Sequence, residues 1–192
     1  MALPTIVAIT PGDDRDLVPW IRALGDGGLP AILVREGGRT EAEVRLLLEV
    51  ARAHVPTVWL HARSLPHDLA LDAVDGVHLP DDGTLPPPSG PWGRSCHTPD
   101  DVRVCWSQGA SWAFLSPIHS PTSKTDDRRP TWGPEPFASL HGPVYALGGM
   151  TPPRHRVAMA AGATGSAVLG DLFGTSTPRM AVERLRAWLP GA

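Results

Sequence analysis

The only lysine of the chain lies in a segment rich in hydroxyl groups. Lys124 ends the stretch Ser116-Pro117-Ile118-His119-Ser120-Pro121-Thr122-Ser123-Lys124, which begins at the end of a short apolar run. A flexible ammonium group among hydroxyls such as that of Thr122 suits the binding of a phosphate or a pyrophosphate. A solvated loop lysine is the alternative, and the neighbouring hydroxyl groups weigh against it.

Two glycine-containing segments nearer the carboxyl end could hold the same kind of ligand. Gly148-Gly149-Met150-Thr151-Pro152 follows one apolar run, and Gly165–Leu172, which contains Leu169 and Gly170, carries the next. Backbone N–H groups freed at such glycines bind phosphate. A tight turn before a capped helix explains the glycine pair equally well. The two segments together favour an anion site.

His97 is the candidate for proton transfer. It stands at the end of a further strand-like run, directly before Thr98, a good helix cap. An imidazole at such a position can move protons near neutral pH. A structural histidine bonded to a neighbouring loop is an equally good interpretation. In a strand, Cys96 points to the opposite face, so we expect a small buried residue there and not a nucleophile.

The histidines and acids raise the question of a metal ion. Four histidines lie at or just beyond the ends of apolar runs: His61, His78, His97 and His119. Their spacing matches no local metal motif, and strand alternation need not aim all four inward, so we predict no histidine-bound metal. The pair Asp81-Asp82 could ligate magnesium or could form a solvated turn.

The elements that position these residues are short apolar runs that alternate with amphipathic segments. The runs are nearly continuously apolar, which is typical of strands buried on both faces. Predicted strands cover Thr5–Thr10, Ala31–Arg35, Thr57–His61, Gly76–Leu79, Gly93–His97, Trp112–Ser116, Val144–Gly148 and Gly165–Gly170. Several intervening segments open with helix caps: Thr40 with Glu43, Thr98-Pro99, Thr151-Pro152 and Thr177-Pro178.

This alternation predicts a parallel βα repeat, either a closed barrel or an open doubly wound sheet. The first strand is followed by Pro11-Gly12-Asp13-Asp14, which is not the glycine-rich loop of an open sheet. We therefore predict a small (β/α)8 TIM barrel, with residues 1–192 as a single domain. In such a barrel the carboxyl ends of the strands face one mouth, where barrel enzymes work.

Reading only the strand ends yields a dense polar set. It comprises Arg35, His61, Arg63, His78, Asp81, Asp82, Ser95, His97, Ser116, His119, Thr122, Lys124, Gly148, Gly149 and Gly170. The rest of the chain is modestly charged, with 17 basic and 20 acidic residues and a net charge of −3. We therefore expect an active site at this mouth.

Composition limits the partners. A net charge of −3 without a run of either sign disfavours nucleic acid or a membrane surface as a partner. No apolar stretch reaches the roughly 20 residues of a membrane span, and the first residues do not resemble a signal peptide. The two cysteines are too few for a disulfide framework. We expect a soluble cytoplasmic protein, and the pattern leaves a homo-oligomer open.

Five segments, taken in order, resemble the thiamine phosphate synthase/TenI family over about residues 5–172. They are Gly76-Val77-His78-Leu79, Gly93-Arg94-Ser95-Cys96-His97, Ser116-Pro117-Ile118 with Pro121-Thr122-Ser123-Lys124, Ala146-Leu147-Gly148-Gly149-Met150 and Ala161-Gly162-Ala163-Thr164-Gly165. The resemblance implies a (β/α)8 barrel that acts on the phosphorylated thiazole half of thiamine.

One activity of the family joins hydroxymethylpyrimidine pyrophosphate to thiazole phosphate with Mg2+. Such synthases carry Gln-x-Arg-Glu-Lys on the second strand, Asn-Asp-Arg on the third and Gly-Gln-Asp/Glu-Asp after the fourth. This chain has Leu33-Val34-Arg35-Glu36-Gly37, His61-Ala62-Arg63 and Pro80-Asp81-Asp82-Gly83 there. The glutamine, the lysine and the acid of the third strand are missing. Asp81 or Asp82 would hold the metal if the chain were a synthase.

The TenI branch aromatises a thiazole phosphate carboxylate tautomer by moving a proton, without a metal or other cofactor. Its Gly-Arg-Ser-Val-His segment carries the acid/base histidine, and His97 matches that position. The resemblance thus favours a thiazole tautomerase, with Arg35 or Lys124 facing the carboxylate. Ser95, Thr122 and Lys124 remain from the family's anion site, and the phosphate would rest near Gly148, Gly149, Leu169 and Gly170. A non-catalytic binder or regulator of phosphate ligands is a third hypothesis.

Overall fold

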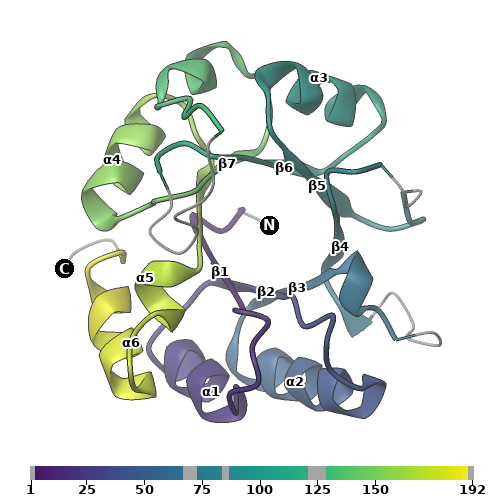
Figure 1. The fold of residues 1–192 in the computed structure, drawn as a ribbon, viewed down its shortest axis with the longest axis vertical. Coiled ribbons are helices and arrows are strands. Elements are labelled where there is room, and N and C mark those ends of the chain that lie inside the picture. Colours follow the sequence, from purple (N-terminus) through teal and green to yellow (C-terminus); the bar gives the residue numbers. More distant parts are fainter. Residues whose placement is uncertain (1–2, 67–72, 84–86, 121–128, 190–192) are drawn as a thin grey trace.

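The computed structural model describes residues 3–66, 73–83, 87–120 and 129–189. Eight parallel strands follow one another around a closed barrel, and β8 pairs with β1 (Figure 1). The strands are β1 Ile6–Ile9, β2 Ala31–Val34, β3 Thr57–His61, β4 Gly76–Leu79, β5 Trp92–Cys96, β6 Trp112–Leu115, β7 Val144–Leu147 and β8 Gly165–Val168. The predicted (β/α)8 barrel is confirmed, and the open doubly wound alternative is wrong.

The predicted strands run slightly too far at their carboxyl ends. Six of them extend one or two residues past the observed end, for example to His97 where β5 stops at Cys96. Several of these final residues, among them Arg35, His97 and Gly148, line the mouth of the barrel. The sequence pattern continues through them because apolar character does not mark where pairing stops.

Helices surround the strands on the outside of the barrel (Figure 1). They are α1 Val18–Asp26, α2 Glu41–His54, α3 Pro99–Ser107, α4 Pro152–Ala160, α5 Gly170–Phe173 and α6 Pro178–Arg186, with 3-10 helices η1 Ala62–Ser64 and η3 Glu135–Ser139. Only η1 is described between β3 and β4. None of the helices in these ranges is long and apolar enough to cross a bilayer.

Most of the predicted helix caps are confirmed. Thr40 and Glu43 form a capping box at the start of α2, and Thr98 forms one with Asp101 at the start of α3. The hydroxyl of Thr177 accepts a hydrogen bond from the backbone N–H of Met180. The prediction for Thr151 is wrong in one respect, because its side chain makes no capping bond, and α4 begins with a proline instead.

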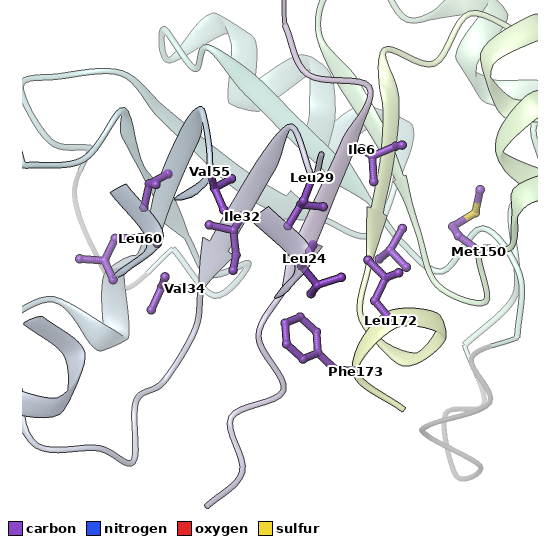
Figure 2. Packing of buried hydrophobic residues seen from close by; sticks show 14 of the residues in the cluster. Ile6, Leu24, Leu29, Ile32, Val34, Val55, Leu60, Met150, Leu172 and Phe173 are labelled. Carbon is purple, nitrogen blue, oxygen red and sulfur yellow. The ribbon is translucent and has the colours of Figure 1, made fainter. Parts of the chain in front are cut away.

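Two separate cores hold the barrel. The larger lies between the strands and the helices, where outward-facing residues such as Ile6 and Ile32 pack with Leu24, Leu172 and Phe173 (Figure 2). The smaller fills the interior and contains Trp59, Trp112, Phe114, Tyr145 and aliphatic neighbours. Because both faces of each strand are covered, the continuously apolar strand pattern is explained.

The interior is filled from one side by a large ring. Trp112 on β6 lies across two neighbouring strands at their glycines, Gly76 and Gly93. A Cβ atom at Gly93 would come within 2.1 Å of the Trp112 Nε1 atom, and one at Gly76 within 2.5 Å of its Cη2 atom. The indole stacks on Trp59, with the ring centroids 4.0 Å apart. These two glycines therefore leave the space that the Trp112 indole occupies.

Candidate functional site

A cavity of about 690 Å³ opens at the carboxyl ends of the strands. Most of the predicted site residues line it together: Arg35, Asp81, Ser95, His97, Gly148, Gly149, Leu169 and Gly170. His61 and His78 also line it. Thr122 and Lys124 fall outside the described residues. His119 is not among the lining residues, so the structure does not bring it to this cavity.

His97 is held by contacts at both ring nitrogens. Its Nδ1 atom lies 3.0 Å from the carbonyl oxygen of Ser116, and its Nε2 atom lies 2.6 Å from the Asp81 carboxylate. The Arg129 Nη1 atom is 2.7 Å from both ring nitrogens. The ring therefore has an acceptor at each nitrogen and a donor beside it. These contacts hold the ring at the wall of the cavity.

The main chain at His97 is also anchored. Its carbonyl oxygen accepts a hydrogen bond of 2.7 Å from the Trp132 indole N–H, and its N–H donates to Asp101. Cys96 faces the outer core and is buried, as predicted. A hydrogen bond with Cys105 and burial both raise the pKa of the Cys96 thiol. Its chemistry is therefore that of a small packing residue.

His61 and His78 are neutral side chains on the floor of the cavity. Burial, with Arg35 and Arg63 nearby, lowers the pKa of His61 to about 4. Complete burial, with smaller effects of His61 and Arg35, lowers the pKa of His78 well below its usual value. Uncharged rings can serve as hydrogen-bonding groups here, but they do not supply positive charge.

Among the described residues, arginines supply the positive charge of the cavity. Arg35, Arg63, Arg129 and Arg154 all line it. Arg63 pairs with Asp82, and Arg154 donates to the carbonyl oxygen of Gly149 at 2.5 Å. Guanidinium groups bind phosphate and carboxylate oxygens in a bidentate manner. The cavity can therefore take an anionic ligand.

The glycine pair after β7 forms a turn that excludes side chains. Gly148 and Gly149 have φ angles of 96° and 57°, which favour glycine. A Cβ atom at Gly149 would come within 2.5 Å of the Ser120 carbonyl oxygen. The tight-turn interpretation therefore holds, and the turn also borders the cavity together with Leu169 and Gly170.

The described acids beside the cavity contact basic side chains or histidine. Asp81 contacts His97, and Asp82 contacts Arg63. Within the part of the chain that the structure describes, no three His, Cys, Asp or Glu side chains converge to hold a metal ion. Ala62 stands where the family's acid on the third strand is expected. Because Mg2+ is usually held by one or two carboxylates together with substrate phosphates, a magnesium site at Asp81 or Asp82 stays a prediction.

Sequence reasoning missed several residues of the site. Arg129 and Trp132 lie far from any predicted strand end, within the long polar segment 116–136. Arg154 is on α4, two residues after its start. Asp81 was recognised, but its contact with His97 was not, because the two belong to different loops. A count of arginines after strand ends could have found Arg154, whereas no local signal marks Arg129.

The comparisons with known proteins agree with this geometry. The family model TMP-TENI, described as thiamine monophosphate synthase, matches residues 6–172. A putative thiamine-phosphate synthase of Geobacter sulfurreducens is 33% identical, with 92% of this chain and 88% of that protein covered. The thiamine-phosphate synthase of Syntrophomonas wolfei is 30% identical, with coverages of 90% and 88%.

Solved structures share the fold. Thiamine phosphate pyrophosphorylase from Pyrococcus furiosus superposes with a TM-score of 0.75 at 21% identity and covers 95% of this chain and 93% of its own. Its counterpart from Bacteroides thetaiotaomicron gives a TM-score of 0.72 at 19% identity, with coverages of 96% and 95%. With the family match over most of its length, the chain belongs to the thiamine monophosphate synthase (TMP-TENI) family.

Proposed function

We propose that this chain is an enzyme of thiamine biosynthesis that binds thiazole phosphate in the cavity at the barrel mouth. The family match and the clustering of His97, the glycine turn and several arginines around one cavity support this proposal. The phosphate would lie between the turn at Gly149 and the segment Leu169-Gly170, with Arg154 beside it. This is the position where TIM barrels commonly hold phosphate groups.

The reaction that the relatives support best is that of a thiamine-phosphate synthase. Two relatives that align with about nine-tenths of the chain carry that name. In this reaction a carbon–oxygen bond to pyrophosphate breaks, and a bond from the same carbon to the thiazole nitrogen forms. The preference for a tautomerase, drawn from the sequence, finds no support among these names.

A synthase built on these residues would differ from its family in the way it balances charge. Asp81 and Asp82 already pair with His97 and Arg63, so in this proposal arginines stabilise much of the charge of the leaving pyrophosphate. Arg35, Arg63 and Arg129 line the cavity and can donate to its oxygens.

A thiazole tautomerase is the second candidate, and one observation favours it. His97 has Asp81 at one ring nitrogen and the Ser116 carbonyl at the other, which suits a group that accepts and returns a proton. In that reaction His97 would take a proton from one carbon of the thiazole and deliver it at another position, and Arg35 or Lys124 would face the carboxylate. A non-catalytic binder is the remaining hypothesis.

One pair of assays separates these functions. The purified protein is incubated with hydroxymethylpyrimidine pyrophosphate and thiazole phosphate, and released pyrophosphate is measured with magnesium and with EDTA. The thiazole carboxylate tautomer is supplied in parallel, and its aromatisation is followed by absorbance. Release of pyrophosphate supports the synthase, and release in EDTA supports charge balance by arginines. Aromatisation alone would overturn the synthase in favour of the tautomerase, and thermal stabilisation by thiazole phosphate without either turnover would leave a binder.

A further inference from the structure

The floor of the cavity contains a hydrogen-bonded chain of three side chains from three strands. The Trp112 indole N–H donates to His78 Nδ1 over 3.1 Å. His78 Nε2 lies 3.0 Å from the Ser95 hydroxyl oxygen. Trp112 is on β6, His78 on β4 and Ser95 on β5, so the hydrogen-bonded chain follows the inner face of three neighbouring strands, and His78 and Ser95 line the cavity.

The hydrogen bonds between Trp112, His78 and Ser95 fix the tautomer of His78. An indole N–H is only a donor, so the Nδ1 atom that it faces must carry a lone pair. The proton of the neutral ring is therefore on Nε2, where it points at Ser95. A second proton on the ring would place two N–H groups against each other. Burial of His78, which lowers its pKa, agrees with this assignment.

The tautomer in turn fixes the direction of the Ser95 hydroxyl. Because its oxygen accepts the proton of His78 Nε2, its own O–H must point elsewhere. Ser95 faces the barrel interior and lines the cavity together with Arg35 and His97. The hydroxyl is thereby turned toward a ligand as a donor, and polarisation along the chain strengthens it.

The geometry leaves little freedom to change this direction. Trp112 is clamped between Gly76 and Gly93 on one side and the stacked ring of Trp59 on the other. His78 packs against Phe114, with the ring centroids 4.2 Å apart. Side chains packed at this density do not change rotamer without cost. The hydrogen-bonded side chains of Trp112, His78 and Ser95 therefore form a fixed part of the barrel and not a flexible contact.

We propose that Trp112 and His78 are positioning residues that orient the Ser95 hydroxyl as a donor to an oxyanion of the ligand. The identity of that ligand rests on the proposed function, since a phosphate, pyrophosphate or carboxylate oxygen all accept. The contact with His78 takes one lone pair of the Ser95 oxygen and leaves the hydroxyl proton for a ligand oxygen.

Binding of inorganic pyrophosphate to the purified protein, measured by calorimetry, tests the role of these three side chains without turnover. Ser95→Ala removes the donor and should weaken binding about tenfold or more, as expected for a hydrogen bond to a charged group. His78→Leu should come close to that loss. His78→Gln should stay within about twofold of the original protein, because its amide can accept from Trp112 and donate to Ser95.

Trp112→Phe and Trp59→Phe form a matched pair. Both remove part of an indole from the same stack, but only the first removes the donor to His78. We expect Trp112→Phe to weaken pyrophosphate binding by about three- to tenfold and to let the His78 proton move to Nδ1. Proton–nitrogen correlation NMR of the imidazole reports that change. Trp59→Phe should leave both the tautomer and the affinity unchanged.

Two results would overturn the proposal: an unchanged His78 tautomer and affinity in Trp112→Phe, or a loss in His78→Gln as large as that in His78→Leu. Equal losses in both tryptophan variants would also overturn it, because they would indicate packing alone. The tautomer and the pyrophosphate affinity are measured without a thiazole substrate. A failure of the proposed enzymatic function therefore leaves these results standing, and the two failures are distinguishable.

Discussion

His78 and His97 come from neighbouring strands of one barrel, yet their surroundings give them different chemistry. His78 lies on the floor, fully enclosed, with one donor and one acceptor that allow a single protonation pattern. His97 lies on the rim, where its side chain is 31% exposed and has acceptors at both nitrogens. The comparison indicates that burial and partner type separate a proposed positioning histidine on the floor from a proposed acid/base histidine on the rim.

The largest effect is expected from the rim histidine. His97→Asn keeps a hydrogen-bonding group but cannot carry a proton, so in the tautomerase reading proposed above the aromatisation rate should fall by roughly two to four orders of magnitude. Thiazole phosphate binding should change little. The rate is measured by the absorbance of the aromatic product, with His119→Asn as the matched control outside the cavity lining. An unchanged rate in His97→Asn would remove the acid/base role.

Burial of His61 on the floor of the cavity should make the free energy of unfolding depend on pH. The pKa of His61 is about 4 in the folded chain, below its ordinary value of 6.5, so the unfolded chain binds more protons between these values. This contribution to the free energy of unfolding is present above pH 6.5 and is lost as the pH falls toward 4, by about 3 kcal/mol. Urea unfolding of the original chain and of His61→Gln from pH 7 to pH 4 measures it. Equal losses in both proteins would contradict the assignment.

The packing of the floor predicts a smaller change in stability. In Gly93→Ala the new methyl group meets the Trp112 indole, and overpacking of this kind costs about 1–3 kcal/mol. Gly90→Ala is the control, because a Cβ atom there meets nothing within 4 Å. Chemical denaturation gives both values. A Gly93→Ala variant as stable as Gly90→Ala would mean that the ring can move aside.

The smallest effect is expected at the partner of the rim histidine. The Asp81 side chain is 49% exposed, and solvent weakens its pairing with His97. Asp81→Asn should therefore slow a His97-dependent reaction by no more than about fivefold, the scale of an exposed ion pair. Asp100→Asn on α3 removes a similar exposed carboxylate away from the cavity and serves as the control. A loss as large as that of His97→Asn would place Asp81 in the proton-transfer machinery itself.

Sequence patterns predicted the barrel and most of the rim because both depend on local signals. Apolar runs located all eight strands, and the residues that follow them, such as Arg35 and Gly149, line the cavity. The approach of Asp81 to His97 was out of reach, since it depends on how two loops fold over the mouth. Arg129 has no strand-end signal at all. The contact between Trp112 and His78 depends on the stagger of strands around the closed barrel, which composition does not encode.

The Trp112 indole occupies the space that side chains at positions 76 and 93 would need. Substitutions at these three positions should therefore be coupled in evolution. A side chain at position 76 or 93 needs room that the indole occupies, so we expect relatives that carry one to have a smaller residue at 112. Those relatives would also lack the indole N–H that faces position 78. Substitution at one of the three sites would then be tolerated only when the others change with it, and the hydrogen-bonding character of the floor would change in a single step.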